Sequence, residues 1–235
     1  MYETIIISII SLGTIAAIFD ILPGYIYFKN RFVKRYVRYF VAFAAGTVLG
    51  TVFFELLPES NVESNFYFVA IGFLVFYTIE KLIILHSCGE PECETHEVSS
   101  ISVVGMASDN ILDGVALGVG YLINPSLGFL LLFAIVVHEI PQGITSAQIM
   151  KETGYNEKKI YVFLIFAGLM YVLGSVISLF IPKEYFIYAI AFVAGIFLYI
   201  GTSDLLMEAH KKFNIHVINI VIIGVVIVAL LEFFI

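Results

Sequence analysis

Charged residues and cysteines are both scarce in this chain of 235 residues. Only 13% of the residues are charged, and Cys88 and Cys93 are the only cysteines, too few for a disulfide framework. The basic residues are spread over short stretches and form no groove-sized patch, so nucleic acid is not an expected partner. The first four residues show neither a basic leader nor a small-residue cleavage site, so we expect the first hydrophobic segment to be retained.

Hydrophobic residues, by contrast, make up 60% of the chain. A soluble protein of this length could not hide so much apolar surface, so the sequence predicts an all-α, multi-pass protein of the lipid bilayer, and we expect the cell membrane. Apolar runs of about 20 residues predict membrane-spanning helices. We predict spans at residues 4–28, 39–58, 66–85, 100–123, 126–150, 160–180, 185–207 and 215–234. The connections are short, which indicates a single transmembrane domain, 1–235.

The distribution of basic residues predicts the orientation of these spans. Positively charged residues accumulate in cytoplasmic connections of membrane proteins. The first connection and the inner end of the third span hold Lys29, Arg31, Lys34, Arg35, Arg38 and Lys81, and the fifth and seventh connections hold Lys151, Lys158, Lys159, Lys211 and Lys212. Only Lys183 falls on the other side. The odd-numbered connections are therefore predicted to be cytoplasmic, with both termini outside.

Two similar segments indicate an internal repeat. Residues 54–60 read Phe-Glu-Leu-Leu-Pro-Glu-Ser and end the second span, whereas residues 203–209 read Ser-Asp-Leu-Leu-Met-Glu-Ala and end the seventh. The first segment runs outward and the second inward. A motif repeated in opposite orientation predicts an inverted repeat, with spans one to three mirrored by six to eight around the fourth and fifth. Chance similarity of two helix ends is the alternative.

The fourth and fifth spans carry ionisable groups where hydrocarbon tolerates few. Each charged side chain near a bilayer centre costs roughly 2.5–3.5 kcal/mol, so such groups usually face partners, water or a cargo. Asp109 and Asp113 share one helix face, with Asn110 beside them, and His138 and Gln142 share another, with Glu139 beside them. Carboxylate, imidazole and amide oxygen suit a divalent ion such as Zn²⁺, Fe²⁺ or Mn²⁺. Polar pairing that only joins two helices is the structural alternative.

These motifs resemble those of a known family. Asp-Asn-Ile-Leu-Asp-Gly (109–114) followed by His-Glu-Ile-Pro-Gln-Gly (138–143) is similar to the paired signatures of the ZIP (Zrt-/Irt-like) divalent metal transporters. The resemblance implies a 3+2+3 inverted repeat that admits Zn²⁺, or Fe²⁺, Mn²⁺ or Cd²⁺, into the cytoplasm between spans four and five. It carries Asn110, Asp113, His138 and Glu139 over as matched metal-binding positions. It also implies a homodimer, although the sequence itself shows no interface.

Two positions depart from the family pattern. Asp109 stands where histidine is usual, and Gln142 stands where a second acid or histidine is usual. Asp109 can still bind a metal ion and makes the site harder and more anionic. Gln142 offers only a neutral oxygen, so we expect one well-formed metal site rather than two. The preferred ion is not determined by these residues.

Further candidates lie outside the two motifs. The cytoplasmic loop 87–99 resembles a shortened form of the family's metal-attracting loop, with His86, Cys88, Cys93 and His96 as candidate ligands; an acidic solvated loop is the alternative. Asp20, Glu55 and Asp204 lie in or near spans and are candidates for lining the ion pathway. The metal is expected as transported substrate, and no catalytic cofactor is expected.

Two other functions compete with transport. A metal-sensing or non-transporting homologue, disabled by Gln142, would bind metal without moving it. An intramembrane metalloprotease is the enzymatic alternative, because residues 138–142 resemble His-Glu-x-x-His. Three features weigh against the protease: the second histidine is Gln142, Pro141 interrupts the motif, and Leu-Asp-Gly precedes the histidine instead of following it.

Overall fold

The computed structural model describes residues 2–29, 31–88, 100–152, 154–211 and 214–234, and its regular elements over these ranges are all helical. The all-α class predicted from the sequence is confirmed. The elements are α1 (Tyr2–Lys29), α2 (Arg31–Thr51), η1 (Val52–Leu56), α3 (Leu57–Glu59), α4 (Val62–Cys88), α5 (Ser100–Ile123), α6 (Pro125–Glu152), α7 (Glu157–Ser178), η2 (Lys183–Tyr185), α8 (Phe186–Tyr199), η3 (Ile200–Leu205), α9 (Leu206–Ala209) and α10 (Ile215–Phe234).

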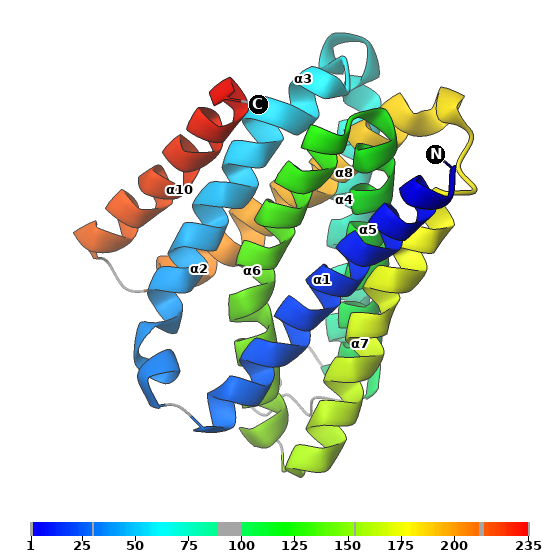
Figure 1. The fold of residues 1–235 in the computed structure, drawn as a ribbon. Coiled ribbons are helices and arrows are strands. Elements are labelled where there is room, and N and C mark those ends of the chain that lie inside the picture. Colours follow the sequence, from blue (N-terminus) through cyan, green and yellow to red (C-terminus); the bar gives the residue numbers. More distant parts are fainter. Residues whose placement is uncertain (1, 30, 89–99, 153, 212–213, 235) are drawn as a thin grey trace.

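Each predicted span overlaps one helix or a continuous run of helical segments. Within the described ranges, six segments are long and apolar enough to cross a membrane: Glu3–Ile26, Tyr36–Glu59, Val62–Leu82, Pro125–Ile144, Glu157–Ser178 and Lys183–Ala209. The apolar stretch Ile215–Leu231 covers most of α10. The chain is therefore a multi-pass membrane protein. The start of α1 and the end of α10 lie at the same end of the bundle (Figure 1), as an even number of spans requires.

Two spans are interrupted by π-helical turns at matching positions. The turn η1 ends at Leu56, directly after Glu55, the first acidic residue of segment 54–60. The turn η3 ends at Leu205, directly after Asp204, the first acidic residue of segment 203–209. A π-helical turn is a rare insertion within an α-helix that occurs frequently at functional sites. The two similar sequence segments thus share an uncommon backbone conformation, which supports the inverted repeat over chance similarity.

The packing of helix pairs follows the same symmetry. Helix α1 packs on α6 as α7 packs on α5, and α4 packs on α8 as α10 packs on α2. The last two pairs approach through glycines on both helices, because a side chain at any of them would meet the partner's backbone: Gly72 and Gly195 for α4 and α8, Gly46 and Gly224 for α2 and α10. The 3+2+3 arrangement remains a prediction, and these pairs support it.

Helices α5 and α6 occupy the centre of the bundle. Helix α6 contacts α1 and α2, and α5 contacts α7, α8 and α1 (Figure 1). Pro141 lies inside the continuous helix α6. Buried apolar residues of most of these helices form one core, which includes Leu117, Leu131 and Phe197. The polar residues of the two motifs are therefore enclosed by other helices and do not face lipid.

Candidate metal site

Three side chains from two helices meet at the centre of the bundle. Asp113 comes from α5, and His138 and Glu139 come from α6; all three are fully buried. Nε2 of His138 lies 3.2 Å from Oδ2 of Asp113 and 3.0 Å from Oε1 of Glu139. One ligand atom from each residue lies within 4.8 Å of the others, a spacing that suits a single metal ion.

The imidazole of His138 is oriented by its own helix. Its Nδ1 lies 3.1 Å from the carbonyl oxygen of Ala134, one turn earlier in α6. Because a carbonyl oxygen only accepts, Nδ1 carries the proton, and in a neutral ring Nε2 then presents a lone pair. The ring also packs edge-on against Phe197, with centroids 5.8 Å apart. This is the arrangement of a metal-binding histidine, whose second nitrogen is held by a backbone acceptor.

The lone pair of His138 faces two carboxylates in a site closed to water. Both oxygens of Asp113 and both of Glu139 lack a hydrogen-bond partner within the described part of the chain. Buried carboxylates repel one another and lose their hydration, so they require a cation or protons between them. A divalent cation would supply that compensation and use all three groups as ligands.

Gln142 and Asp109 form a polar pair beside this group. The amide Nε2 of Gln142 donates a hydrogen bond of 3.2 Å to Oδ2 of Asp109. The amide nitrogen of Gln142 thus orients the carboxylate of Asp109. The other oxygen of Asp109 is buried and has no hydrogen-bond partner among the described residues. Asp109 therefore keeps one oxygen available for a cation.

A third helix contributes Asp20, which the sequence identified only as a candidate for the pathway. Asp20 is fully buried in α1, and its Oδ2 accepts a hydrogen bond of 3.2 Å from Nδ2 of Asn110. Gly143 of α6 allows this approach, because a side chain there would meet the backbone carbonyl oxygen of Asp20. The glycine that ends residues 138–143 therefore lets α1 lie against the site.

Two residues of α7 were not among the candidates identified from the sequence. Tyr171 and Ser175 are fully buried, and neither hydroxyl has a hydrogen-bond partner within the described ranges. Tyr171 lies within electrostatic range of Glu139 and Asp20. The available signal was weak: a tyrosine and a serine one turn apart in an otherwise apolar span.

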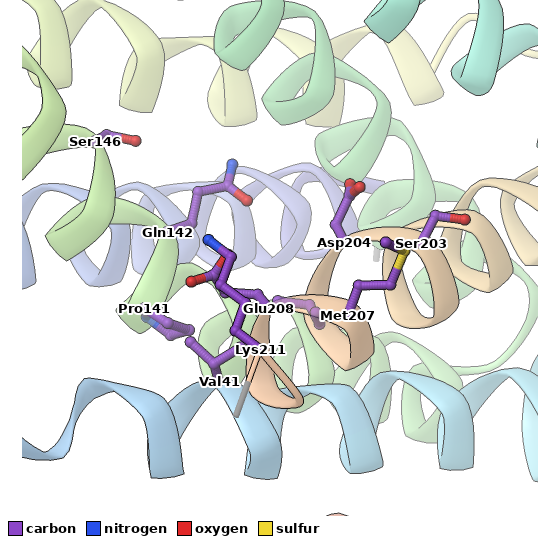
Figure 2. A pocket seen from close by; sticks show the side chains of 10 residues that line it. Val41, Pro141, Gln142, Ser146, Ser203, Asp204, Met207, Glu208 and Lys211 are labelled. Carbon is purple, nitrogen blue, oxygen red and sulfur yellow. The ribbon is translucent and has the colours of Figure 1, made fainter. Parts of the chain in front are cut away.

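A cavity of about 440 Å³ is lined by residues of α2, α6, η3 and α9, among them Gln142. Figure 2 shows Gln142 on one side of it and Asp204 on the other. Lys211, which also lines the cavity, forms an ion pair of 2.5 Å with Glu208. The lining residues are Val41, Pro141, Gln142, Ser146, Ser203, Asp204, Leu205, Met207, Glu208 and Lys211. The cavity thus brings Asp204 of η3 to the same space as Gln142, whose amide contacts Asp109 beside the central group.

Residues 85–232, well over half of the chain, match the family described as ZIP zinc transporter. The chain belongs to this family. The resemblance inferred from residues 109–114 and 138–143 is confirmed. ZIP proteins are transporters and not enzymes, so the metalloprotease alternative is set aside. The matched region includes every residue of the central group and the lining of the cavity except Val41.

Among ZIP relatives, the chain is similar to zinc transporter ZIP13 of Pongo abelii, with 26% identity over 178 residues. That alignment covers 71% of this chain and 53% of the relative. Zinc transporter zipt-7.2 of Caenorhabditis elegans is 26% identical over 125 residues, 49% of this chain and 27% of the relative. Zinc transporter ZIP13 of Danio rerio is 26% identical over 141 residues, which cover 56% of this chain and 40% of the relative. The chain thus spans about a quarter to a half of these relatives.

Of the remaining candidates in this ZIP protein, the structure describes the side chain of Glu55 alone. Glu55 lies in η1, half-buried, in the turn that matches η3. The candidate loop ligands His86, Cys88, Cys93 and His96 fall outside the side chains that the structure describes. Their role in attracting metal stays a prediction.

Proposed function

We propose that the protein carries a divalent metal ion across the membrane into the cytoplasm, with Asp113, His138 and Glu139 as the central ligands. The observation that carries this proposal is their convergence in the buried centre of the bundle, with ligand atoms within 4.8 Å. Membership of the ZIP family supports metal as the substrate. Such a group is costly to bury without a cation, which favours a binding role over simple helix pairing.

The ligand chemistry favours Zn²⁺ and its neighbours among the divalent ions. Imidazole nitrogen and carboxylate oxygen are both zinc ligands, and carboxylate and amide oxygens also suit Fe²⁺ and Mn²⁺. Asp109 and Asn110 of α5 and Gln142 of α6 complete the surroundings as oxygen donors or as partners that orient them. We include Cd²⁺ as a further substrate because it resembles Zn²⁺ in charge and ligand preference.

The proposed route continues through the cavity of Figure 2. From the central group an ion passes Gln142, reaches the carboxylate of Asp204, and leaves past Glu208 and Lys211. The positive-inside rule assigns that end to the cytoplasm, because Lys211 lies there with most of the other basic residues. Both termini are then outside. Alternating access would move the central pair α5 and α6 relative to the two repeats.

Location and assembly complete the proposal. We assign the protein to the cell membrane, as expected for uptake into the cytoplasm, and we propose a homodimer on the basis of the family resemblance. The transport route described above lies within one chain. A chain that remains monomeric in detergent and in lipid, yet transports metal, would therefore overturn only the homodimer.

The test is uptake of Zn²⁺, Fe²⁺, Mn²⁺ and Cd²⁺ into proteoliposomes that contain wild type, Asp113→Asn or Glu184→Gln. Asp113→Asn removes one ligand charge at constant shape, and uptake should fall by at least about tenfold, because a lost second-shell group alone costs 10–100-fold. Glu184→Gln is the matched control, since Glu184 is exposed in η2 and should leave uptake unchanged.

Two results would contradict transport. If purified wild type binds metal but carries no flux of any of the four ions, the sensor or non-transporting homologue becomes the better function. Equal flux in wild type and Asp113→Asn would remove the central group from the pathway.

A further inference from the structure

Tyr171 of α7 carries a buried hydroxyl that the proposed function does not use. Tyr171 is 0% exposed, and its hydroxyl has no hydrogen-bond partner in the described part of the chain. Buried tyrosines usually find such a partner, and an unpartnered buried hydroxyl costs roughly 1–3 kcal/mol. A position that only fills the core would be better occupied by phenylalanine. The hydroxyl therefore indicates a polar partner that joins the site.

Helix α7 holds Tyr171 against α1, close to Asp20. A Cβ at Gly13 of α1 would lie 3.0 Å from the carbonyl oxygen of Tyr171, and a Cβ at Gly168 of α7 would lie 2.8 Å from the side chain of Ile21. The two helices are therefore antiparallel. Because helical side chains lean toward the start of their own helix, the ring of Tyr171 leans from the level of Gly13 toward that of Ile21. That direction leads to Asp20.

The same residue packs against α5 close to Asn110. A side chain at Gly114 would meet the carbonyl oxygen of Tyr171, and Asn110 lies one turn nearer the start of α5. Farther along both helices, a side chain at Gly118 would meet Ser178, so α5 and α7 run parallel. The ring of Tyr171 thus also leans along α5 toward Asn110.

The vacant acceptors of the site lie in this direction. The hydrogen bond of 3.2 Å from Asn110 to Asp20 joins α5 to α1, and it leaves Oδ1 of each residue without a partner among the described residues. Both oxygens of Glu139 are buried and likewise unpartnered there. Tyr171 lies within electrostatic range of Asp20 and Glu139 but donates to neither. A hydroxyl both donates and accepts, so a water molecule can join it to such acceptors.

We infer that the hydroxyl of Tyr171 holds a water ligand of the transported ion, which makes Tyr171 a positioning residue of the pathway. This inference rests on the proposed function. Asp113, His138 and Glu139 offer one ligand atom each. A four-coordinate Zn²⁺ then keeps one further position, and a six-coordinate Mn²⁺ keeps three. Water fills such positions, and a hydroxyl from α7 would fix that water as outer-shell partners fix other metal ligands.

The water ligands determine how strongly each ion depends on Tyr171. Mn²⁺ favours six ligands rich in oxygen, and it retains more water than Zn²⁺ does in a tetrahedral site. Loss of the hydroxyl should therefore weaken the binding of Mn²⁺ more than that of Zn²⁺. Tyr171 thus acts on the selectivity of the site without being a direct ligand.

The test compares Tyr171→Phe with wild type in the full-length purified protein. All proteins carry His86→Ala, Cys88→Ser, Cys93→Ser and His96→Ala, so that the loop does not contribute. Calorimetric titration gives the Kd of Mn²⁺ and of Zn²⁺, and thermal unfolding gives the Tm without metal. For Tyr171→Phe we expect the Kd of Mn²⁺ to rise at least about tenfold, that of Zn²⁺ to rise by a smaller factor, and the metal-free Tm not to fall.

Ser175→Ala is the matched control, because it also removes a fully buried, unpartnered hydroxyl from the described part of α7. Oγ of Ser175 is directed at Gly13, which lies seven residues, or about 10 Å, from Asp20 along α1. The metal-free Tm of this variant should likewise not fall, and its Kd values should match those of wild type.

Three outcomes would overturn the inference. Unchanged Kd values in Tyr171→Phe would do so, and an equal loss for both ions would exclude a role through water. A loss of the same size in Ser175→Ala would assign the effect to the packing of α7. Asp113→Asn separates these results from the proposed function, because binding that depends on Asp113 leaves that function intact. If Asp113→Asn binds both ions as tightly as wild type, the proposed function itself fails.

Discussion

His138 and Asp113 approach each other from neighbouring helices, with Nε2 of the imidazole 3.2 Å from Oδ2 of the carboxylate. The opposite ring nitrogen is engaged by the carbonyl oxygen of Ala134. The lone pair of Nε2 therefore points at a carboxylate instead of away from it. This relationship is unfavourable in the absence of a cation or a proton, and it couples the stability of the bundle to metal binding.

Metal ions should raise the thermal stability of the purified protein. A ligand that binds only the folded state stabilises it by about 2.7 kcal/mol when its free concentration is about 100 times Kd. We expect Zn²⁺ or Cd²⁺ to raise the Tm of wild type and of Glu184→Gln equally. Asp113→Asn should lose most of that increase. A Tm increase that survives Asp113→Asn would place the stabilising ion elsewhere, for example at the loop 87–99.

Replacing Gln142 by glutamate should make the protein depend more strongly on metal. The hydrogen bond from Gln142 to Asp109 would become a contact between two carboxylates, which costs roughly 1–3 kcal/mol when no cation is present. A bound divalent ion would reverse that cost. Gln142→Glu should therefore have a lower Tm than wild type without metal and a larger increase with it.

Gln142→Met is the matched control for that change. It removes the amide without adding charge, so its Tm should fall by a similar amount with and without metal. Equal metal responses in Gln142→Glu and Gln142→Met would contradict a cation position beside Asp109.

Gly143 should tolerate no side chain, because α1 crosses α6 at this residue. A methyl group at Gly143 would meet the backbone carbonyl oxygen of Asp20, which cannot move without the whole of α1. We expect Gly143→Ala to cost about 1–3 kcal/mol and to weaken metal binding. At Gly120 the nearest atom is a terminal methyl group of Leu131, so Gly120→Ala should cost less. Thermal unfolding and metal titration of both variants make the comparison, and equal losses would show that the crossing is not tight.

The sequence predicted the helices and singled out the buried polar residues at the centre because both depend on local patterns. Apolar runs of membrane length determine the helices, and the four-residue spacing of Asp109 and Asp113 determines their shared face. The contact between Asp20 and Asn110 could not be predicted in this way, since it depends on how α1 packs on α5. Nor could the sequence show that Gln142 donates to Asp109, because an amide can offer either its nitrogen or its oxygen.

The conformation of the π-helical turns could not be predicted from the sequence either. The similarity of residues 54–60 and 203–209 predicted that the two segments are equivalent, but their backbone conformation depends on tertiary packing. The matching turns strengthen the evidence for an inverted repeat. Asp204, a residue of η3, lines the cavity. Because residues of η3 line the cavity, the proposed ion route through it can be tested by chemical labelling.

Cysteines introduced along the cavity should react with a charged, membrane-impermeant thiol reagent from the cytoplasmic side alone. Ser146 and Ser203 line the cavity from α6 and η3, and a water-filled route would admit the reagent to both. Leu169→Cys is the control, because Leu169 is 56% exposed on α7 in a membrane-spanning segment and should face lipid. The variants are made with Cys88→Ser and Cys93→Ser and labelled in vesicles of known orientation. Labelling of Ser203→Cys from the outside would invert the predicted orientation, and equal labelling of Leu169→Cys would show that reactivity does not report the cavity.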